Sequence, residues 1–127
     1  MIELTETTED RAAGCCNPGL APRIGPDEAR ELSDDLSILA NPIRLQILDM
    51  LAQRDGHVCV CDLEVALPVK QPTVSHHLRL LRAAGMIDCE RRGLWVYYFV
   101  QRESLADLRA RMLDRFDALA YSTEQHD

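Results

Sequence analysis

The sequence has no long hydrophobic run, few aromatic residues and no glycine-rich loop of the kind that holds phosphates. It has 127 residues, which suits one domain, and only 5% of them are aromatic. Because a bilayer span needs about 20 apolar residues, no transmembrane helix and no membrane partner are expected. The acidic first thirty residues lack the apolar core of a signal peptide, which predicts a cytoplasmic protein. Without a phosphate loop or a nucleophile elbow, a small thiol enzyme is the less favoured interpretation.

The cysteines are few but clustered. Cys15 and Cys16 are adjacent, Cys59 and Cys61 are separated by one residue, and Cys89 stands alone. An odd count in a reducing compartment argues against a disulfide framework, and neighbouring cysteines make a strained pair. Clustered thiols that stay reduced bind soft metals or respond to oxidants, so we expect one of these roles.

The net charge of −7 is unevenly distributed along the chain. Acidic residues dominate the first 35 positions, whereas residues 69–100 carry five basic side chains against two acidic ones. The basic residues are Lys70, Arg79, Arg82, Arg91 and Arg92. A local basic patch of this kind indicates nucleic-acid binding even in a chain that is acidic overall.

The pattern of breakers and periodic segments predicts a flexible, cysteine-bearing arm over residues 1–25, an ordered domain over 26–121 and a short tail over 122–127. Helices are expected near 26–40, from Pro42 after an Asn41 cap, over 62–67, over 72–84 and over 104–120. Residues 58–60 read as a brief strand that directs Cys59 and Cys61 to one side, with Asp62 capping the helix that follows. Two β-rich runs around Arg92-Gly93 predict a hairpin.

These elements give a mainly α fold with a small β-hairpin, in the order of a winged helix-turn-helix. The exposed side of the helix at 72–84 offers hydrogen-bonding groups that can read base edges in a major groove. These candidate DNA-binding residues are Gln71, Thr73, Ser75, His76 and Arg79. Arg91 and Arg92 at the hairpin tip would contact phosphates or a minor groove. A solvated helix face and an ordinary turn are the alternative interpretation.

The runs LANPIRLQILDMLA, CVCDLE, QPTVSHHLRLLRAAGMI and WVYYFV together resemble the ArsR/SmtB family of metal-sensing repressors. The resemblance covers roughly residues 30–120. It implies a homodimer that binds a palindromic, double-stranded operator in its ion-free form and releases it when an inducer binds. The first and last helices would form the dimer interface, although the apolar stripe ending in Phe116 and Leu119 could equally be core.

CVCDL resembles the arsenic-responsive motif of the family, in which a third cysteine usually completes CxCxxC. Glu64 stands at that position here, and its hard oxygen is a poor ligand for As(III) or Sb(III), which prefer three sulfurs. We expect Cys15 and Cys16 to supply the missing sulfur, because the roughly ten residues between Cys16 and the first helix can extend roughly 30 Å, to a site in the same subunit or in the partner. All four thiols could instead hold zinc, cadmium or lead, or sense oxidants or persulfide.

Each of these cysteines and histidines also has an interpretation in which it binds no ion. Cys59 and Cys61 could be small structural residues, and the two arm cysteines could be incidental. Cys89 is expected to fill space in the core, His57 to be a surface residue, and His77 to be partly packed. The final helix carries acidic residues but no histidine, which disfavours a zinc site there.

Overall fold

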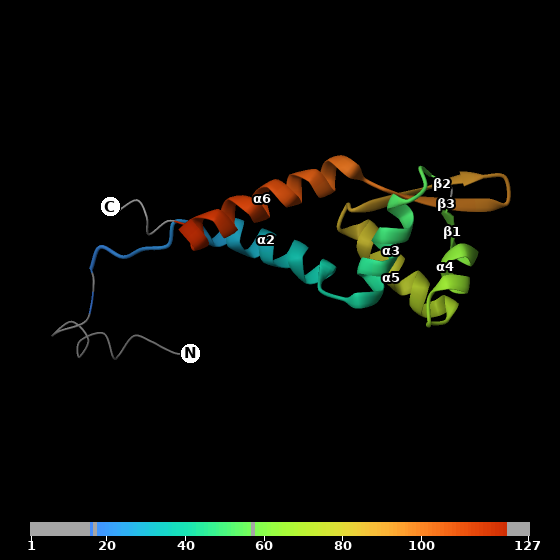
Figure 1. Ribbon diagram of the computed structural model, residues 1–127, viewed down its shortest axis with the longest axis horizontal. Helices are drawn as coiled ribbons and strands as arrows, with labels where there is room; N and C mark the ends of the chain where they lie inside the picture. Colours follow the sequence, from blue (N-terminus) through green and yellow to red (C-terminus); the bar gives the residue numbers. More distant parts are fainter. Residues whose placement is uncertain (1–15, 17, 57, 122–127) are drawn as a thin grey trace.

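The computed structural model describes residues 16, 18–56 and 58–121, so Cys15 and His57 lie outside the described residues. The molecule is elongated, with α2 (Pro26–Leu39) and α6 (Arg102–Tyr121) side by side at one end (Figure 1). At the other end, α3 (Pro42–Ala52), α4 (Val60–Ala66) and α5 (Gln71–Ala83) gather against a small sheet. The predicted fold class, a mainly helical winged helix-turn-helix, is confirmed.

Local capping signals fix where the central helices begin and end. Asn41 caps α3, because its Oδ1 accepts hydrogen bonds from the backbone N–H groups of Ile43 (2.9 Å) and Arg44 (3.1 Å). The chain leaves α5 through Gly85 at φ +77°, a conformation that suits glycine. There the Met86 N–H donates to Leu81 (3.1 Å), which closes a Schellman motif.

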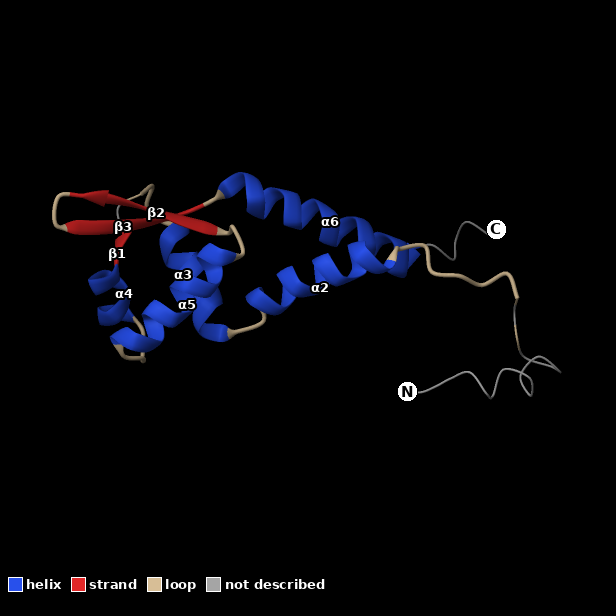
Figure 2. Ribbon diagram, turned by 180° about the vertical axis from the view of Figure 1, so that it is seen from behind, coloured by secondary structure: helices blue, strands red, loops and turns tan. Residues whose placement is uncertain are grey.

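The sheet has three antiparallel strands rather than the two of the expected hairpin (Figure 2). β2 (Ile87–Arg92) and β3 (Trp95–Val100) form the predicted wing around Gly93, which has φ +64°. β1 (Val58–Cys59) pairs with the other edge of β3, with Val58 opposite Tyr98. The segment that carries the first thiol is therefore hydrogen-bonded to the wing.

The strand and helix around CVCDL differ from the prediction. β1 stops at Cys59, and α4 already begins at Val60, so Cys61 lies in the first turn of the helix and not on a strand. Cys59 occupies the N-cap position, and Asp62 is the third residue of the helix rather than its cap. The Asp62 carboxylate instead accepts the Cys59 N–H at 3.0 Å, which is the reciprocal half of a capping box.

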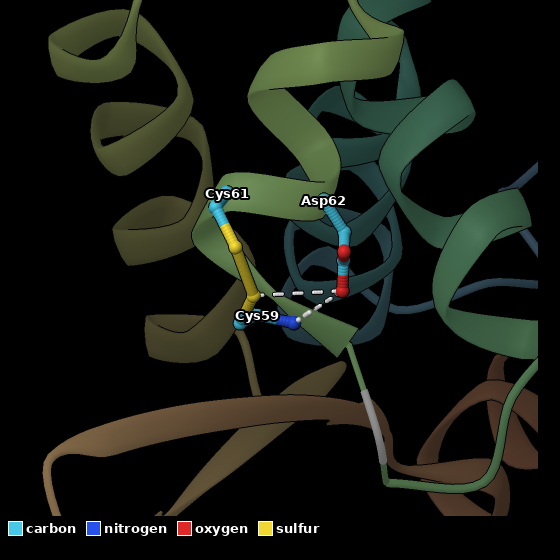
Figure 3. Close-up of side chains that lie close together, drawn as sticks. All are labelled: Cys59, Cys61 and Asp62. Carbon is cyan, nitrogen blue, oxygen red and sulfur yellow. Dashed lines mark hydrogen bonds between the residues drawn. A yellow bond between two sulfur atoms is a disulfide. The ribbon is translucent and has the colours of Figure 1, made fainter.

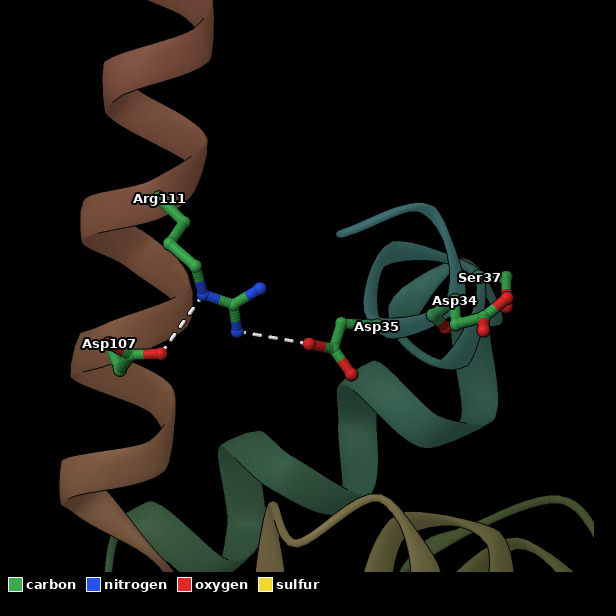
Figure 4. A network of polar contacts seen from close by, with 5 residues as sticks. All are labelled: Asp34, Asp35, Ser37, Asp107 and Arg111. Atoms are coloured by element: carbon green, nitrogen blue, oxygen red, sulfur yellow. Dashed lines mark hydrogen bonds and ion pairs between the residues drawn. The ribbon is translucent and has the colours of Figure 1, made fainter. Parts of the chain in front are cut away.

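The core lies between the central helices and the sheet and extends between α2 and α6. Its buried apolar residues are Leu32, Ile47, Leu51, Val58, Leu63, Leu67, Val74, Leu78, Leu81, Met86, Ile87, Val100 and Leu108. A polar link also ties the outer helices, since Arg111 donates to Asp35 at 3.0 Å and to Asp107 at 2.9 Å (Figure 4).

The apolar stripe of α6 divides between two environments. Leu108 is buried and Met112 packs against the core, but Phe116 and Leu119 are 55% and 77% exposed in the single chain. The start of the stripe is therefore core, and its end, at Phe116 and Leu119, is an exposed apolar surface in the single chain. Among the described residues, no helix combines the length and apolar character that a bilayer span requires.

Candidate metal and DNA sites

Cys59 and Cys61 come together at the junction between β1 and α4 (Figure 3). The structure joins their sulfurs in a disulfide, with the two Cα atoms 5.4 Å apart. The sequence predicted reduced thiols, and the difference has a local origin. An extended residue followed by the first helical turn turns both side chains toward the same side, so a spacing of one residue suffices to bring the sulfurs into contact.

Asp62 adds an oxygen to this sulfur pair. One carboxylate oxygen of Asp62 and the two sulfurs all lie within 4.8 Å of one another, which is close enough for three donors to surround one ion. The Cys59 Sγ lies 3.5 Å from Asp62 Oδ2, a contact that becomes a hydrogen bond when the cysteine is a thiol. In the sequence, Glu64 stands at the position of the third ligand and Asp62 is expected only to cap a helix, although the Cys-x-x-Asp spacing of a capping box already places the Asp62 carboxylate near Cys59.

The described part of the arm lies far from this cluster within one chain. Residues 18–25 leave the molecule at the end where α2 begins, opposite to β1 and α4 (Figure 1). To return to its own Cys59, the arm would have to run back along the whole of α2, which is about 21 Å long at 1.5 Å per residue, and then past α3 and α5 to the start of α4. Cys16 is exposed, and Cys15 lies outside the described residues.

Cys89 is separate from the thiol pair. It lies on β2 directly opposite Tyr98, in the row of the sheet that also contains Val58. Cys59 lies in the next row, with Tyr97, and side chains of successive rows point to opposite faces of a sheet. Cys89 is half-buried on the side of the buried Val58 and is not among the buried core residues, so it is less enclosed than expected.

The candidate reading face of α5 is accessible along its length. Gln71, Thr73, His76 and Arg79 are exposed and Ser75 is half-buried, while Val74, His77, Leu78 and Leu81 face the core. Gln71 Nε2 donates to Ser75 Oγ at 3.3 Å, so these two polar groups sit together near the start of the helix. The helix thus buries the side that the sequence predicts to face inward and exposes the side that it predicts to face outward.

The two arginines of the wing have exposed side chains, as a DNA contact requires, although Arg92 is already engaged. Its guanidinium lies 3.4 Å from the Glu90 carboxylate and 5.5 Å from the centre of the Tyr97 ring. Arg92 therefore contacts two other residues of the wing, one on each strand. The turn beyond it presents Leu94, which is 91% exposed.

A groove of about 540 Å³ lies between α5 and β3, where the reading helix meets the wing. It is lined by Ser75, Leu78, Arg79, Arg82, Ala83 and Tyr98. Arg82 Nε donates to Asp88 at 3.0 Å. The pKa of Asp88 is lowered by the hydrogen bond from the Cys89 N–H and then by Arg82, so the acid keeps its charge beside the guanidinium.

The sequence places Arg82 in the basic patch of residues 69–100 but does not single it out as a DNA contact, and it gives no sign of Tyr98. Arg82 follows Ser75 and Arg79 at helical spacing, and this periodicity was a usable signal. Tyr98 reaches the groove only through the pairing of the strands, which no local pattern reveals. Burial raises the pKa of Tyr98, so its hydroxyl stays protonated and can donate a hydrogen bond.

Two helices in a helix-turn-helix, an exposed polar helix face and a basic wing are the features of a DNA-binding regulator. The arsR family of bacterial regulatory proteins matches residues 41–88. The chain is 40% identical over 116 residues to the HTH-type transcriptional repressor SmtB of Mycobacterium tuberculosis, spanning 91% of this chain and 78% of that protein. The chain therefore belongs to the arsR family of transcriptional repressors.

Two further comparisons agree with this assignment. The arsenical resistance operon repressor of Bacillus subtilis is 37% identical over 84 residues, covering 66% of this chain and 79% of the relative. Among solved structures, the homodimeric winged helix-turn-helix DNA-binding domain of Mb0332 from Mycobacterium bovis aligns with a TM-score of 0.56. It shares 30% identity and covers 81% of this chain and 95% of that domain.

Proposed function

We propose that this protein is a homodimeric repressor that grips its operator without an ion and releases it when As(III) or Sb(III) binds through cysteine thiolates. The observation that carries the proposal is the contact between the sulfurs of Cys59 and Cys61 at the start of α4. α4 is the helix immediately before the reading helix, and two adjacent soft donors are the start of a soft-ion site. Both cysteines must be reduced for this chemistry.

The third ligand decides which ion binds. A trivalent arsenic or antimony ion prefers three sulfurs, and the arm thiols Cys15 and Cys16 can supply the third or a fourth. Because the arm starts at the far end of its own α2, a site shared with the partner subunit is the better supported arrangement. If Asp62 is the third donor instead, two sulfurs and one oxygen suit zinc, cadmium or lead.

The proposed coupling is mechanical. α4 packs against α5, and its fully buried Leu63 belongs to the same core as the inner face of α5, so a displacement of the first turn of α4 should be transmitted to the reading helix. Two reading helices of a dimer must lie one turn of DNA apart, about 34–36 Å. An ion that draws α4 toward the arm would move each reading helix away from this spacing and weaken the operator complex.

The test is an operator-binding titration with the reduced protein and DNA from upstream of its own gene, with arsenite, antimonite, cadmium and zinc added separately. We expect arsenite or antimonite to release the wild-type protein. Cys59→Ser with Cys61→Ser should still bind DNA but ignore the ion, whereas the control Cys89→Ser should respond like the wild type. No binding to any DNA would refute the repressor assignment, and release by zinc or cadmium alone would refute the arsenic assignment.

A second variant separates the arm from the cluster. Cys15→Ser with Cys16→Ser should bind the operator normally and respond poorly to arsenite, because only two thiolates remain. An unchanged arsenite response would exclude the arm as a source of ligands. The number of sulfurs around the bound ion, measured by X-ray absorption, gives an independent count.

The disulfide between Cys59 and Cys61 favours one alternative, a sensor of oxidants or persulfide. Oxidation would close the pair, with two thiols losing two protons and two electrons to the oxidant. In that case oxidant should release the operator from the wild type and dithiol reductant should restore binding. Mass spectrometry of the released protein would show the loss of two hydrogens.

A further inference from the structure

A buried histidine lies on the inner side of the reading helix. His77 is only 8% exposed and shares the core face of α5 with Val74, Leu78 and Leu81. A buried imidazole requires hydrogen-bond partners, because burial removes the water that would otherwise satisfy it. Its partner comes from a different helix.

Arg44 of α3 donates from Nε to His77 Nδ1 at 3.1 Å and from Nη1 to the carbonyl oxygen of Ile38 at 2.9 Å. Ile38 belongs to the last turn of α2, so one guanidinium joins the end of α2 to the reading helix. The backbone N–H of Arg44 is itself held by the Asn41 cap at 3.1 Å. Arg44 therefore sits at the junction of three helices with its backbone and side chain both fixed.

The direction of these bonds defines the state of the ring. Nδ1 of His77 accepts from a cation, so the imidazole is neutral and carries its proton on Nε2. Burial, then Arg44 and then His76 lower the pKa of His77, which keeps the ring neutral at physiological pH. The link requires a planar donor that can reach two acceptors, which lysine cannot provide in the same geometry.

We propose that Arg44 is a positioning residue that sets the angle of the reading helix relative to α2, and through it the spacing of the two reading helices in the dimer. This inference rests on the proposed function, since it presupposes an operator with two half-sites. α2 and α6 form the end of the molecule that carries the exposed apolar residues Phe116 and Leu119, the surface available to a second copy. Arg44 connects that end to α5, because it donates one hydrogen bond to Ile38 of α2 and one to His77 of α5.

The experiment measures how sharply the protein discriminates half-site spacing. An operator is first selected with the wild-type protein from random duplex DNA, and versions with one base pair added or removed between the half-sites are made. One base pair shifts the half-sites by about 3.4 Å along the axis. The wild type should lose about tenfold in affinity on the shifted operators, the cost of about one poorly matched contact.

Arg44→Gln should reduce this discrimination to about twofold or less while binding to a single half-site stays near the wild-type value. Arg111→Gln is the matched control, because it breaks another arginine link between helices, α6 to α2, without touching α5. The control should retain the wild-type discrimination. If Arg44→Gln discriminates spacing as sharply as the wild type, the inference is wrong.

Two further measurements keep the test decisive. If Arg44→Gln fails to fold, Arg44→Lys replaces it, since the ammonium keeps the charge but cannot bond both acceptors in the same way. A nitrogen-15 spectrum of the His77 ring should show the Nε2–H tautomer in the wild type and a shifted Nδ1 signal in either variant. A wild type that selects no operator would instead refute the proposed function and not the role of Arg44.

Discussion

The first turn of α4 and the reading helix α5 are held in different ways. α4 begins at a cluster bound by short-range contacts, in which the Cys59 N–H, two sulfurs and the Asp62 carboxylate lie within four residues. α5 is held by long-range contacts: three buried apolar side chains and the bond from Arg44, which lies 33 residues away from His77. A ligand can therefore rearrange the start of α4 without first breaking the core.

This difference fits the task proposed for each helix. A sensing element must have two accessible arrangements. Local contacts between partly exposed groups can be broken and remade at a small cost in free energy. A reading element must hold its orientation to within a fraction of a DNA turn, and long-range packing supplies that rigidity. Substitutions that remove the contacts of each helix test this difference, from the largest expected effect to the smallest.

Leu63→Ala should give the largest loss, because Leu63 is fully buried and anchors α4 to the core. Removing a buried leucine side chain costs about 2–5 kcal/mol of unfolding free energy, measurable by urea denaturation. Val65→Ala, on the same helix but 88% exposed, should change it by less than about 0.5 kcal/mol. Equal effects of the two substitutions would mean that α4 is not anchored as described.

Asp62→Ala should have an intermediate effect at the start of α4. It removes the acceptor of the Cys59 N–H and should cost about 0.5–2 kcal/mol, the range for lost helix caps. Asp62→Asn retains an acceptor oxygen and should lose less. If the two variants unfold alike, the carboxylate does not cap the helix through this bond.

The stability of the α5 junction should depend on pH in a defined direction. Burial lowers the pKa of His77 below its usual 6.5, so between the lowered value and 6.5 the folded chain binds fewer protons than the unfolded chain. The stabilising contribution is complete above pH 6.5 and is lost as the pH falls, at no more than about 1.4 kcal/mol per pH unit. His77→Gln should flatten this part of the urea-denaturation profile; an unchanged slope would assign the effect to other groups.

The smallest expected effect concerns the groove between α5 and the wing. Arg82→Gln should weaken binding to all DNA sequences about equally and reduce the slope of log affinity against log salt by about one, as the loss of one phosphate contact does. Gln71→Ala should instead alter base preference and leave the salt slope unchanged. If Arg82→Gln changes the base preference, Arg82 contacts the bases and not the phosphate backbone.

Local signals in the sequence were sufficient for most of the fold. Asn41-Pro42 predicts the start of α3, Gly85 the end of α5, and Arg92-Gly93 the turn of the wing, because each acts on its neighbours alone. The pairing of β1 with β3, the approach of Tyr98 to the groove and the bond from Arg44 to His77 depend on distant segments meeting. The β-prone residues Val58 and Val60 predict a strand that includes Cys61, but the capping spacing of Cys59 and Asp62 starts the helix at Val60 instead.

The most direct test measures the arsenite affinity of the reduced protein by calorimetry, alone and with saturating operator. Linkage requires operator to weaken arsenite binding by the same factor by which arsenite weakens operator binding. We expect a clear loss of arsenite affinity on the operator complex. An arsenite affinity that is the same with and without operator would contradict the claim that ion capture at Cys59 and Cys61 opposes DNA binding.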